Sequence, residues 1–284
     1  MSVSRRRFLE ITGSAAAAAL ATELFGLPEL LAENTGSGKP SALLSALAEV
    51  ALEAAKKAGA TYADIRINRY RDQVVGLRTS PDAATGQLNH VPRVNENETF
   101  GFGVRVIANG TWGFAASRVV TKDEIARVAR EAVAVAKANS ALQRLPVKLA
   151  PVKAYTDKWT TPYTKNPFDV PIGQKLALLE KTNAEVKAEA KVFAANSVMV
   201  AHTEEKFFAS SEGSRIQQYI AQSYGQVTAQ ARDLATRTSR SRSYSPSPYT
   251  AGYEAVEEAD LPGNARRIGE EVVEHLSAPA VTPG

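Results

Sequence analysis

Strand-forming residues on both sides of Asn109-Gly110 make the stretch from Thr99 to Ser117 the clearest pattern in the chain. A two-residue type I′ turn needs positive φ at both central positions, which Asn tolerates and Gly adopts at little cost. The pattern therefore predicts a β-hairpin. Its register pairs Ala108 with Thr111, Ile107 with Trp112, Val106 with Gly113 and Val104 with Ala115.

In this register large side chains lie opposite small ones on both faces of the hairpin. The two faces carry Phe102, Val104 and Val106 opposite Gly113 and Ala115, and Trp112 and Phe114 opposite Gly103, Arg105 and Ile107. We therefore expect a strand pair that is covered on both faces and has a structural role.

Helical periodicity lies on both sides of this hairpin. One predicted helix opens at Pro40 and ends near Gly59, which is placed as a C-cap. A second helix begins at the capping box Thr121–Glu124 and continues with an apolar stripe from Ile125 to Ala136.

Between the first helix and the hairpin, Ala63–Asn68 alternates like a half-buried strand, and Gln73–Arg78 is predicted as its partner. Residues Ser80–Glu98 are rich in Pro, Asn, Asp and Gly, which favours an exposed loop. The first unit is therefore predicted as helix, four strands, helix.

The second half repeats this order, although no residue-level repeat is present. A Pro-rich connection, Leu145–Pro171, leads to a helix from Ile172 to about Ala190. The remaining predicted elements are strands Val192–Thr203, Lys206–Ser210, Arg215–Ile220 and Gly225–Gln230, a turn at Ser211–Gly213, a loop at Ser241–Pro248 and a helix near Asn264–Leu276.

The chain is thus predicted as α+β, with antiparallel sheets, packed helices and two helix–four-strand–helix units. We expect a signal and linker at 1–39, an N-terminal unit at 40–145, a connection at 146–171 and a second unit at 172–284.

The N-terminus resembles a twin-arginine export signal, because Ser4, Arg5, Arg6, Phe8 and Leu9 precede a mildly apolar, alanine-rich run. The run is too short and interrupted for a stable membrane span. A basic tail is the alternative. We expect export by the twin-arginine route to the periplasm.

Composition excludes some chemistry. The 284 residues include no cysteine, so disulfides, thiolate metal sites and a cysteine nucleophile are excluded. A net charge of +4 gives no case for nucleic-acid binding. Arg237, Arg240 and Arg242, near Tyr244 and Tyr249, are more typical of a solvated sheet edge than of a site for single-stranded nucleic acid.

Histidines are few and dispersed. His90 lies in a polar loop, His202 in a predicted strand and His275 near a helix end. Glu271 and His275 are four apart on one helix face, but two ligands do not make a zinc site, so we favour a structural role for the pair. No carboxylate pair or Ser/His/Asp spacing stands out.

Several stretches, in this order, carry a family resemblance: Gly59–Arg66, Gly101–Val106, Gly113–Ser117, Ser210–Ser214, Gly252–Glu254 and Glu270–Pro279. Together they resemble the N-terminal half of the TldD/PmbA family of metallopeptidases, once described as modulators of DNA gyrase. The resemblance covers roughly Leu43 to Ala280. Its structural landmarks are Gly101, Gly103, Arg105, Asn109, Gly110, Gly113, Phe114 and Gly213.

The resemblance implies peptide hydrolysis at a zinc site of the form His-Glu-x-x-x-His, with a further ligand downstream, in a C-terminal half. This sequence has no His-Glu pair and ends at Gly284, close to where that half would begin. We therefore expect no catalytic or metal residue in this chain and zinc only in a complementing half. Alone, the chain is expected to be inactive.

By the same resemblance, such halves help to wall a chamber for unfolded peptides and associate as dimers. The expected partners are a TldD/PmbA-type subunit or metallopeptidase half and unfolded peptide, with no nucleic acid. The alternative is an exported binding or assembly module that docks onto a separately encoded metallopeptidase half and has no activity of its own.

Overall fold

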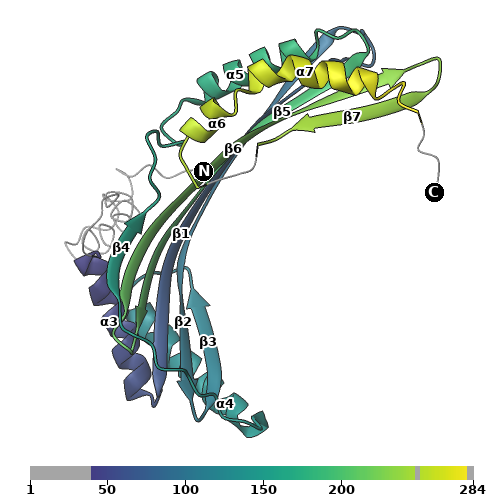
Figure 1. Cartoon of the computed structure of the whole chain (residues 1–284). Coiled ribbons are helices and arrows are strands. Elements are labelled where there is room, and N and C mark those ends of the chain that lie inside the picture. The colour runs from purple at the N-terminus through teal and green to yellow at the C-terminus, as the bar shows by residue number, and fades with distance from the viewer. Residues whose placement is uncertain (1–39, 247–249, 280–284) are drawn as a thin grey trace, which may run out of the picture. The chain divides into compact units, whose positions relative to one another are not determined.

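Seven strands form one sheet in the computed structural model, which describes residues 40–246 and 250–279 (Figure 1). The strand order is β3-β2-β1-β5-β6-β4, and β7 also pairs with β6. The strands are β1 Tyr62–Pro81, β2 Leu88–Ala108, β3 Thr111–Ser117, β4 Thr156–Thr160, β5 Val192–Ser210, β6 Arg215–Asp233 and β7 Thr238–Tyr244. The described part of the chain also has five α-helices, so the predicted α+β class is confirmed.

The predicted hairpin is the β2–β3 pair. Its turn has φ of 51° at Asn109 and 72° at Gly110, and the strands pair antiparallel from Ala108↔Thr111 to Phe102↔Ser117. The register is therefore confirmed. Coverage on both faces was a wrong prediction, because the Phe114 side chain is 60% exposed.

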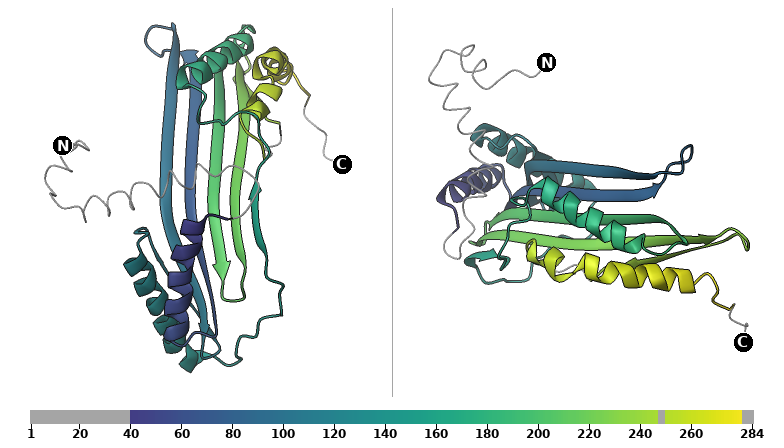
Figure 2. Two further views of the ribbon diagram at one scale, coloured as in Figure 1. Left: turned by 90° about the vertical axis from the view of Figure 1, so that its left-hand side faces the viewer. Right: turned by 90° about the horizontal axis from the view of Figure 1, so that it is seen from above.

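Of the described residues, one compact unit comprises 40–70, 99–160 and 204–219, and its two described α-helices are α3 Ala42–Lys57 and α4 Lys122–Asn139. Figure 2 shows these helices side by side. Their apolar stripes bury a core with one face of the sheet, including Ile65 and Ile67 of β1 and Val104 and Val106 of β2. Alternation along the strands therefore leaves the opposite face free of α3 and α4.

Local signals fix the ends of these helices. Ser41, rather than Pro40, is the N-cap of α3, and its hydroxyl accepts a hydrogen bond from the Leu44 amide. Gly59, with φ of 101°, follows the last turn, and the Ala60 amide donates to the Ala55 carbonyl. This is a Schellman motif, which needs glycine at that point. Thr121 caps α4 as predicted, by accepting from the Glu124 amide.

Predicted breaks in two long strands are absent. Ala63–Asn68 and Gln73–Arg78 belong to the single strand β1, and Val192–Thr203 and Lys206–Ser210 belong to β5. Polar and charged residues in the middle of these strands pair between neighbouring strands. Arg69 Nη1 lies 3.1 Å from Glu205 Oε1, and His202 Nδ1 lies 2.7 Å from Asp72 Oδ1.

The predicted loop Ser80–Glu98 is also mostly strand, because β2 begins at Leu88. Residues 88–99 are all exposed, and an exposed edge tolerates the polar composition that we interpreted as a loop. The actual turn is short, and the Asp82 amide donates to the Gln87 carbonyl at 2.7 Å.

Three further strand assignments differ from the prediction. Arg215–Ile220 and Gly225–Gln230 form one strand, β6, in which Gly225 makes room for Leu261. The predicted connection contains β4, which pairs parallel with β6. The predicted loop from Ser241 overlaps β7, which pairs antiparallel with β6.

Of the described residues, the second compact unit comprises 71–98, 161–203, 220–246 and 250–279. Its described α-helices are α5 Ile172–Val186, α6 Glu254–Glu258 and α7 Leu261–Glu274. Helices α5 and α7 pack together, and Leu179, Ile268 and Val272 are fully buried. The predicted domain boundaries at 145 and 171 stay a prediction.

The glycine at position 113 generates the first testable prediction. A Cβ added there would lie 2.0 Å from the Ala132 carbonyl oxygen and 2.6 Å from the Ala136 amide nitrogen of α4. Gly113→Ala should therefore lower the free energy of unfolding by about 3 kcal/mol, measured by urea denaturation. The control is Gly173→Ala in α5, where nothing lies within 4 Å and a gain of up to about 1 kcal/mol is expected. Equal effects would contradict the close approach of α4.

Candidate functional site

A polar and aromatic surface covers the face of the first unit's sheet that lies opposite α3 and α4. We call it the open face. Its residues are Tyr62, Asp64, Arg66, Asn68 and Tyr70 of β1, Gly101, Gly103 and Arg105 of β2, Trp112, Phe114 and Ala116 of β3, and Glu204, Lys206 and Phe208 of β5.

The carboxylate of Asp64 organises this surface. Its side chain is fully buried and accepts hydrogen bonds from three neighbours. Arg66 Nη1 lies 2.6 Å from Oδ1, while Arg105 Nε and the Tyr62 hydroxyl each lie 2.9 Å from Oδ2. The two guanidinium groups outnumber the one carboxylate, so this cluster has a net positive charge. The side chains directly around it are neutral and aromatic.

Aromatic rings hold both guanidinium groups in place. The Arg105 Cζ lies 4.7 Å from the centre of the Trp112 ring, and the Arg66 Cζ lies 5.0 Å from that of Phe208. Tyr62 contacts Trp112 edge to face, with ring centres 5.9 Å apart. Burial and then the Asp64 charge raise the pKa of Tyr62 from 10.0 to about 12. Tyr62 is therefore a neutral donor at ordinary pH.

Beside this cluster, a groove of about 400 Å³ lies along β1, β2 and β3. Its floor includes Gly101 and Gly103. A Cβ at Gly103 would lie 2.9 Å from the Phe114 ring, so the missing side chain allows this ring to lie over β2. Arg66 and Arg118 line the groove, which therefore combines apolar surface with positive charge.

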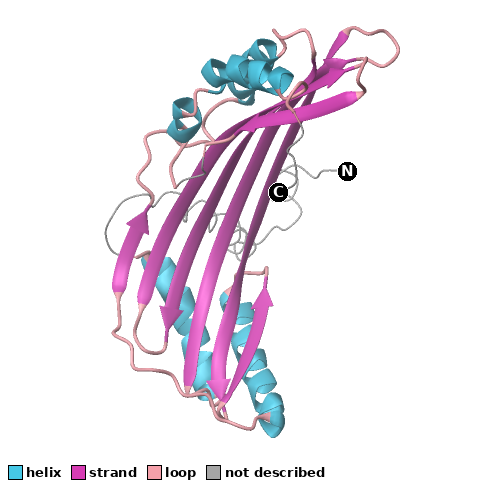
Figure 3. Cartoon of the chain, turned by 45° about the vertical axis from the view of Figure 1, so that its right-hand side comes forward, coloured by secondary structure: helices cyan, strands magenta, loops and turns pink. Residues whose placement is uncertain are grey.

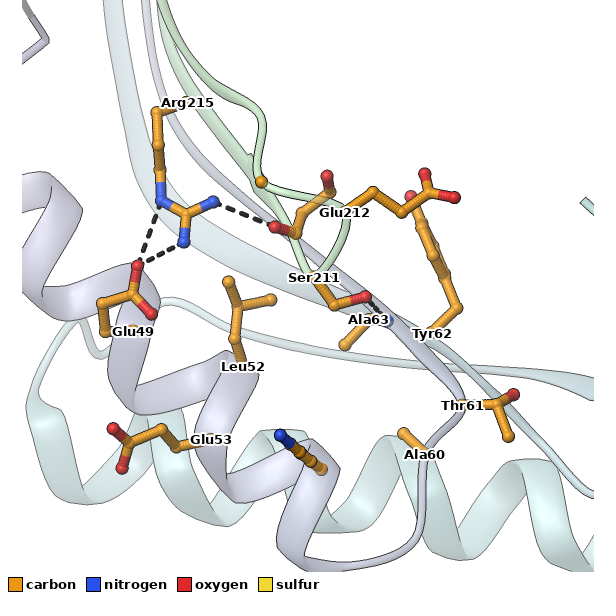
Figure 4. A pocket seen from close by; sticks show the side chains of 13 residues that line it. Glu49, Leu52, Glu53, Ala60, Thr61, Tyr62, Ala63, Ser211, Glu212 and Arg215 are labelled. Carbon is orange, nitrogen blue, oxygen red and sulfur yellow. Dashed lines mark hydrogen bonds and ion pairs between the residues drawn. The ribbon is translucent and has the colours of Figure 1, made fainter. Parts of the chain in front are cut away.

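A second hollow, of about 440 Å³, lies between α3, the start of β1 and the β5–β6 turn (Figure 4). Arg215 Nε donates to Glu49 Oε1 at 3.1 Å, and the Ser211 hydroxyl accepts from the Ala63 amide at 3.0 Å. The described residues that line the two hollows include no histidine. Among the described lining residues, no serine is therefore paired with a histidine base.

The structural landmarks fall in two places. Gly101, Gly103, Arg105, Asn109, Gly110, Gly113 and Phe114 all belong to the β2–β3 hairpin. Gly213, with φ of 98°, forms the β5–β6 turn beside the second hollow. Asp64 and Tyr62 of the open face were not predicted as site residues from the sequence. The only local signal was the i, i+2 spacing of Tyr62, Asp64 and Arg66, which places all three on one face of a strand.

The described residues do not fit a zinc ion. The Glu271 carboxylate forms ion pairs with two arginines, since Arg242 Nε lies 2.6 Å from Oε2 and Arg267 Nη1 lies 2.5 Å from Oε1. The hydrogen bonds that Arg267 and then Arg242 donate hold the pKa of Glu271 below its ordinary value. His275 is exposed, His202 pairs with Asp72, and His90 Nδ1 lies 3.0 Å from the Thr79 hydroxyl. Within the described part of the chain, no three His, Cys, Asp or Glu side chains form a cluster that could hold a metal.

The arginine run lies at a sheet edge, as the favoured interpretation predicted. Arg240 and Arg242 belong to β7, and Arg237 precedes this strand with φ of 56°. The export signal residues lie outside the described residues. Of the described helices, none is long and apolar enough to cross a membrane.

Comparison with known proteins places this fold. Residues 63–136 match the PmbA/TldA metallopeptidase domain 1, and residues 165–277 match the PmbA/TldA metallopeptidase central domain. A metalloprotease of Methanocaldococcus jannaschii is 29% identical over 159 residues, which are 55% of this chain and 32% of that protein. A metalloprotease of Methanothermobacter thermautotrophicus is 27% identical over 217 residues, which are 76% of this chain and 44% of that protein. The chain thus spans less than half the length of these relatives.

Solved structures share the fold at low identity. A proposed modulator of DNA gyrase from Thermotoga maritima matches with a TM-score of 0.60 at 14% identity, over 85% of this chain and 50% of that one. A second proposed modulator of DNA gyrase, from Bacteroides thetaiotaomicron, matches with a TM-score of 0.60 at 11% identity, over 83% of this chain and 50% of that one. TldE from Thermococcus kodakarensis matches with a TM-score of 0.54 at 14% identity, over 80% of this chain and 46% of that one.

Replacing the buried carboxylate tests the open-face cluster. Asp64→Asn should lower the free energy of unfolding by about 2 kcal/mol, because both guanidinium groups lose their anion. It should also lower the pKa of Tyr62, because the Asp64 charge and hydrogen bond both raise it. The folded-state pKa lies above the unfolded value. The stability that Tyr62 contributes is therefore complete below pH 10 and lost as the pH rises toward about 12.

Urea denaturation below pH 10 and near pH 12 measures the slope of the unfolding free energy against pH. The Tyr62→Phe variant shows whether this slope comes from Tyr62. The control is Asp169→Asn, a carboxylate that is exposed in the described structure. An unchanged slope in both Asp64→Asn and Tyr62→Phe would contradict the assignment.

Proposed function

We propose, from the premise that this chain belongs to the PmbA/TldD metallopeptidase family and spans its domain 1 and central domain, that it is the peptide-binding, non-catalytic part of a zinc metallopeptidase. Zinc and peptide hydrolysis then come from a complementing half or subunit. The chain contributes a wall of the substrate chamber and a surface for dimer formation.

The observation that carries the proposal is the ordered match to two successive domains of one metallopeptidase family. The curated relatives are metalloproteases, of which this chain covers 32% and 44%. Catalytic zinc needs three protein ligands and an open position for water. The sequence contains no His-Glu-x-x-x-His motif, and Glu271, its best single candidate, is neutralised by two arginines.

The open face supports a binding role. Its net positive charge, stacked aromatic rings and groove of about 400 Å³ are features of a surface that holds a peptide chain. Fixed guanidinium groups bind carboxylates without losing much side-chain entropy, because Asp64 already holds them.

Reconstitution tests this proposal. The purified chain alone should hold no stoichiometric zinc and should not cleave an unfolded peptide. Adding a family subunit that carries His-Glu-x-x-x-His should give a complex in which peptide cleavage needs both chains and is lost on chelation. Zinc is measured by metal analysis and cleavage by mass spectrometry.

Two results would redirect the proposal. Stoichiometric zinc and chelator-sensitive cleavage by the chain alone would show that it is itself catalytic. A stable complex whose cleavage rate is the same with and without this chain would instead favour the binding or assembly module.

Export by the twin-arginine route is part of the proposal and rests on Arg5 and Arg6. Replacing both by lysine keeps the charge but removes the paired guanidinium groups. The double variant should stay in the cytoplasm, while wild type is recovered from the periplasm, as measured by fractionation and immunoblotting. The control changes Lys56 and Lys57 to arginine in α3 and should leave export unchanged. Normal export of the double variant would reject this route.

A further inference from the structure

Strand β3 ends the sheet on one side and has an open edge (Figure 3). We propose that this edge binds an extended peptide as an additional strand, and that the preferred peptide is apolar with an acidic residue beside Arg118. The inference rests on the proposed function and identifies the site where that function would capture peptide.

The register shows which backbone groups the edge offers. Residues that flank a two-residue hairpin turn exchange hydrogen bonds, so Thr111, Gly113, Ala115 and Ser117 bond to β2. The Ile107 carbonyl accepts from the Thr61 amide at 2.8 Å, which confirms that odd positions of β2 face β1. The N–H and C=O groups of Trp112, Phe114 and Ala116 therefore point away from the sheet, as strand addition requires.

The β3 edge is less protected than the other strand edges in the described structure. Natural sheets guard open edges with charges or proline. The free part of β2 carries Pro92, Arg93 and Glu96, β4 carries Asp157, and β7 carries two arginines. Strand β3, with the sequence TWGFAAS, has neither a charge nor a proline.

Apolar side chains border this edge on both faces. Phe114, 60% exposed, lies on the open face. On the other face, Ala126 and Arg130 of α4 line a hollow with α3. Val135 is about 2.5 turns beyond Ala126, so it projects from the side of α4 that faces away from α3, and α4 itself packs on β3. Val135 is 38% exposed. An added strand would thus meet apolar surface on both sides.

One end of the β3 edge has an exposed positive charge. Arg118 directly follows β3, is exposed, lines the groove, and forms no ion pair with any other described residue. A carboxylate on the peptide would complement this guanidinium. The edge therefore favours a neutral, apolar segment that ends in an acidic residue.

The test uses the full chain and a fluorescent peptide of alternating Val and Thr with Asp at each end. Fluorescence anisotropy should show saturable binding. Ala116→Pro removes an outward N–H and should raise the dissociation constant about tenfold. Ala83→Pro, in the exposed β1–β2 loop, is the matched control and should bind as wild type. Circular dichroism checks that both variants fold.

A charge exchange tests the acidic preference. Arg118→Glu should weaken the Asp-ended peptide severalfold and bind a Lys-ended peptide better than wild type does. The effect should shrink as salt is raised, because both charges are exposed.

An N-methylated peptide keeps the test independent of protein folding. Methyl groups on alternate backbone nitrogens remove the donors that would pair with β3, so binding should be lost while composition is retained. Equal binding of the methylated and unmethylated peptides, or no effect of Ala116→Pro, would overturn strand addition at β3. If peptide cleavage in the reconstituted complex persisted in either case, the proposed function would stand and only this site would be rejected.

Absence of peptide binding by the wild-type chain would also overturn the inference. Sedimentation would then show whether the edge pairs with a second copy, in which case Ala116→Pro would convert a dimer to a monomer.

Discussion

The backbone contact between Gly113 and α4 determines how the helix lies against the hairpin of the first unit. Without a Cβ at this position, the Ala132 carbonyl and the Ala136 amide reach the surface of β3 directly. This fixes α4 over one face of the hairpin and lets Val106 and Val104 reach the core. The large residues of β3 are consequently left on the opposite face, where Trp112 and Phe114 border a polar surface instead of a core.

The polar surface in turn depends on charges that the fold neutralises locally. A buried carboxylate costs several kcal/mol unless it is paired and hydrogen-bonded. Asp64 meets that condition through Arg66, Arg105 and the Tyr62 hydroxyl. The same logic applies further along β1, where Arg69 pairs with Glu205, so charged residues occupy the middle of a long strand without ending it.

Local signals in the sequence explain which parts of the fold could be predicted. The Asn109-Gly110 turn fixes the hairpin register by itself, and the Thr121 cap and Gly59 fix helix ends from neighbouring residues. Strand lengths could not be predicted this way, because Arg69 and Glu205 are 136 positions apart and each looks like a turn or loop residue alone. Asp64 was missed for the same reason. Tyr62 and Arg66 are its neighbours in the sequence, but its third partner, Arg105, lies 41 positions away and reaches the carboxylate only in the folded sheet.

Strand β3 carries both the open edge and the aromatic border of the open face. An open edge is a liability in proportion to its length and flatness. The edge of β3 is seven residues long, and α4 covers one of its faces, so a single added strand fits more readily than the edge of another flat sheet. The charges that would protect such an edge lie one strand away at Arg105 of β2 and two strands away at Arg66 of β1, where Asp64 and aromatic rings hold them. Arg118, at the end of the strand, therefore remains as the charged group that an incoming chain would meet first.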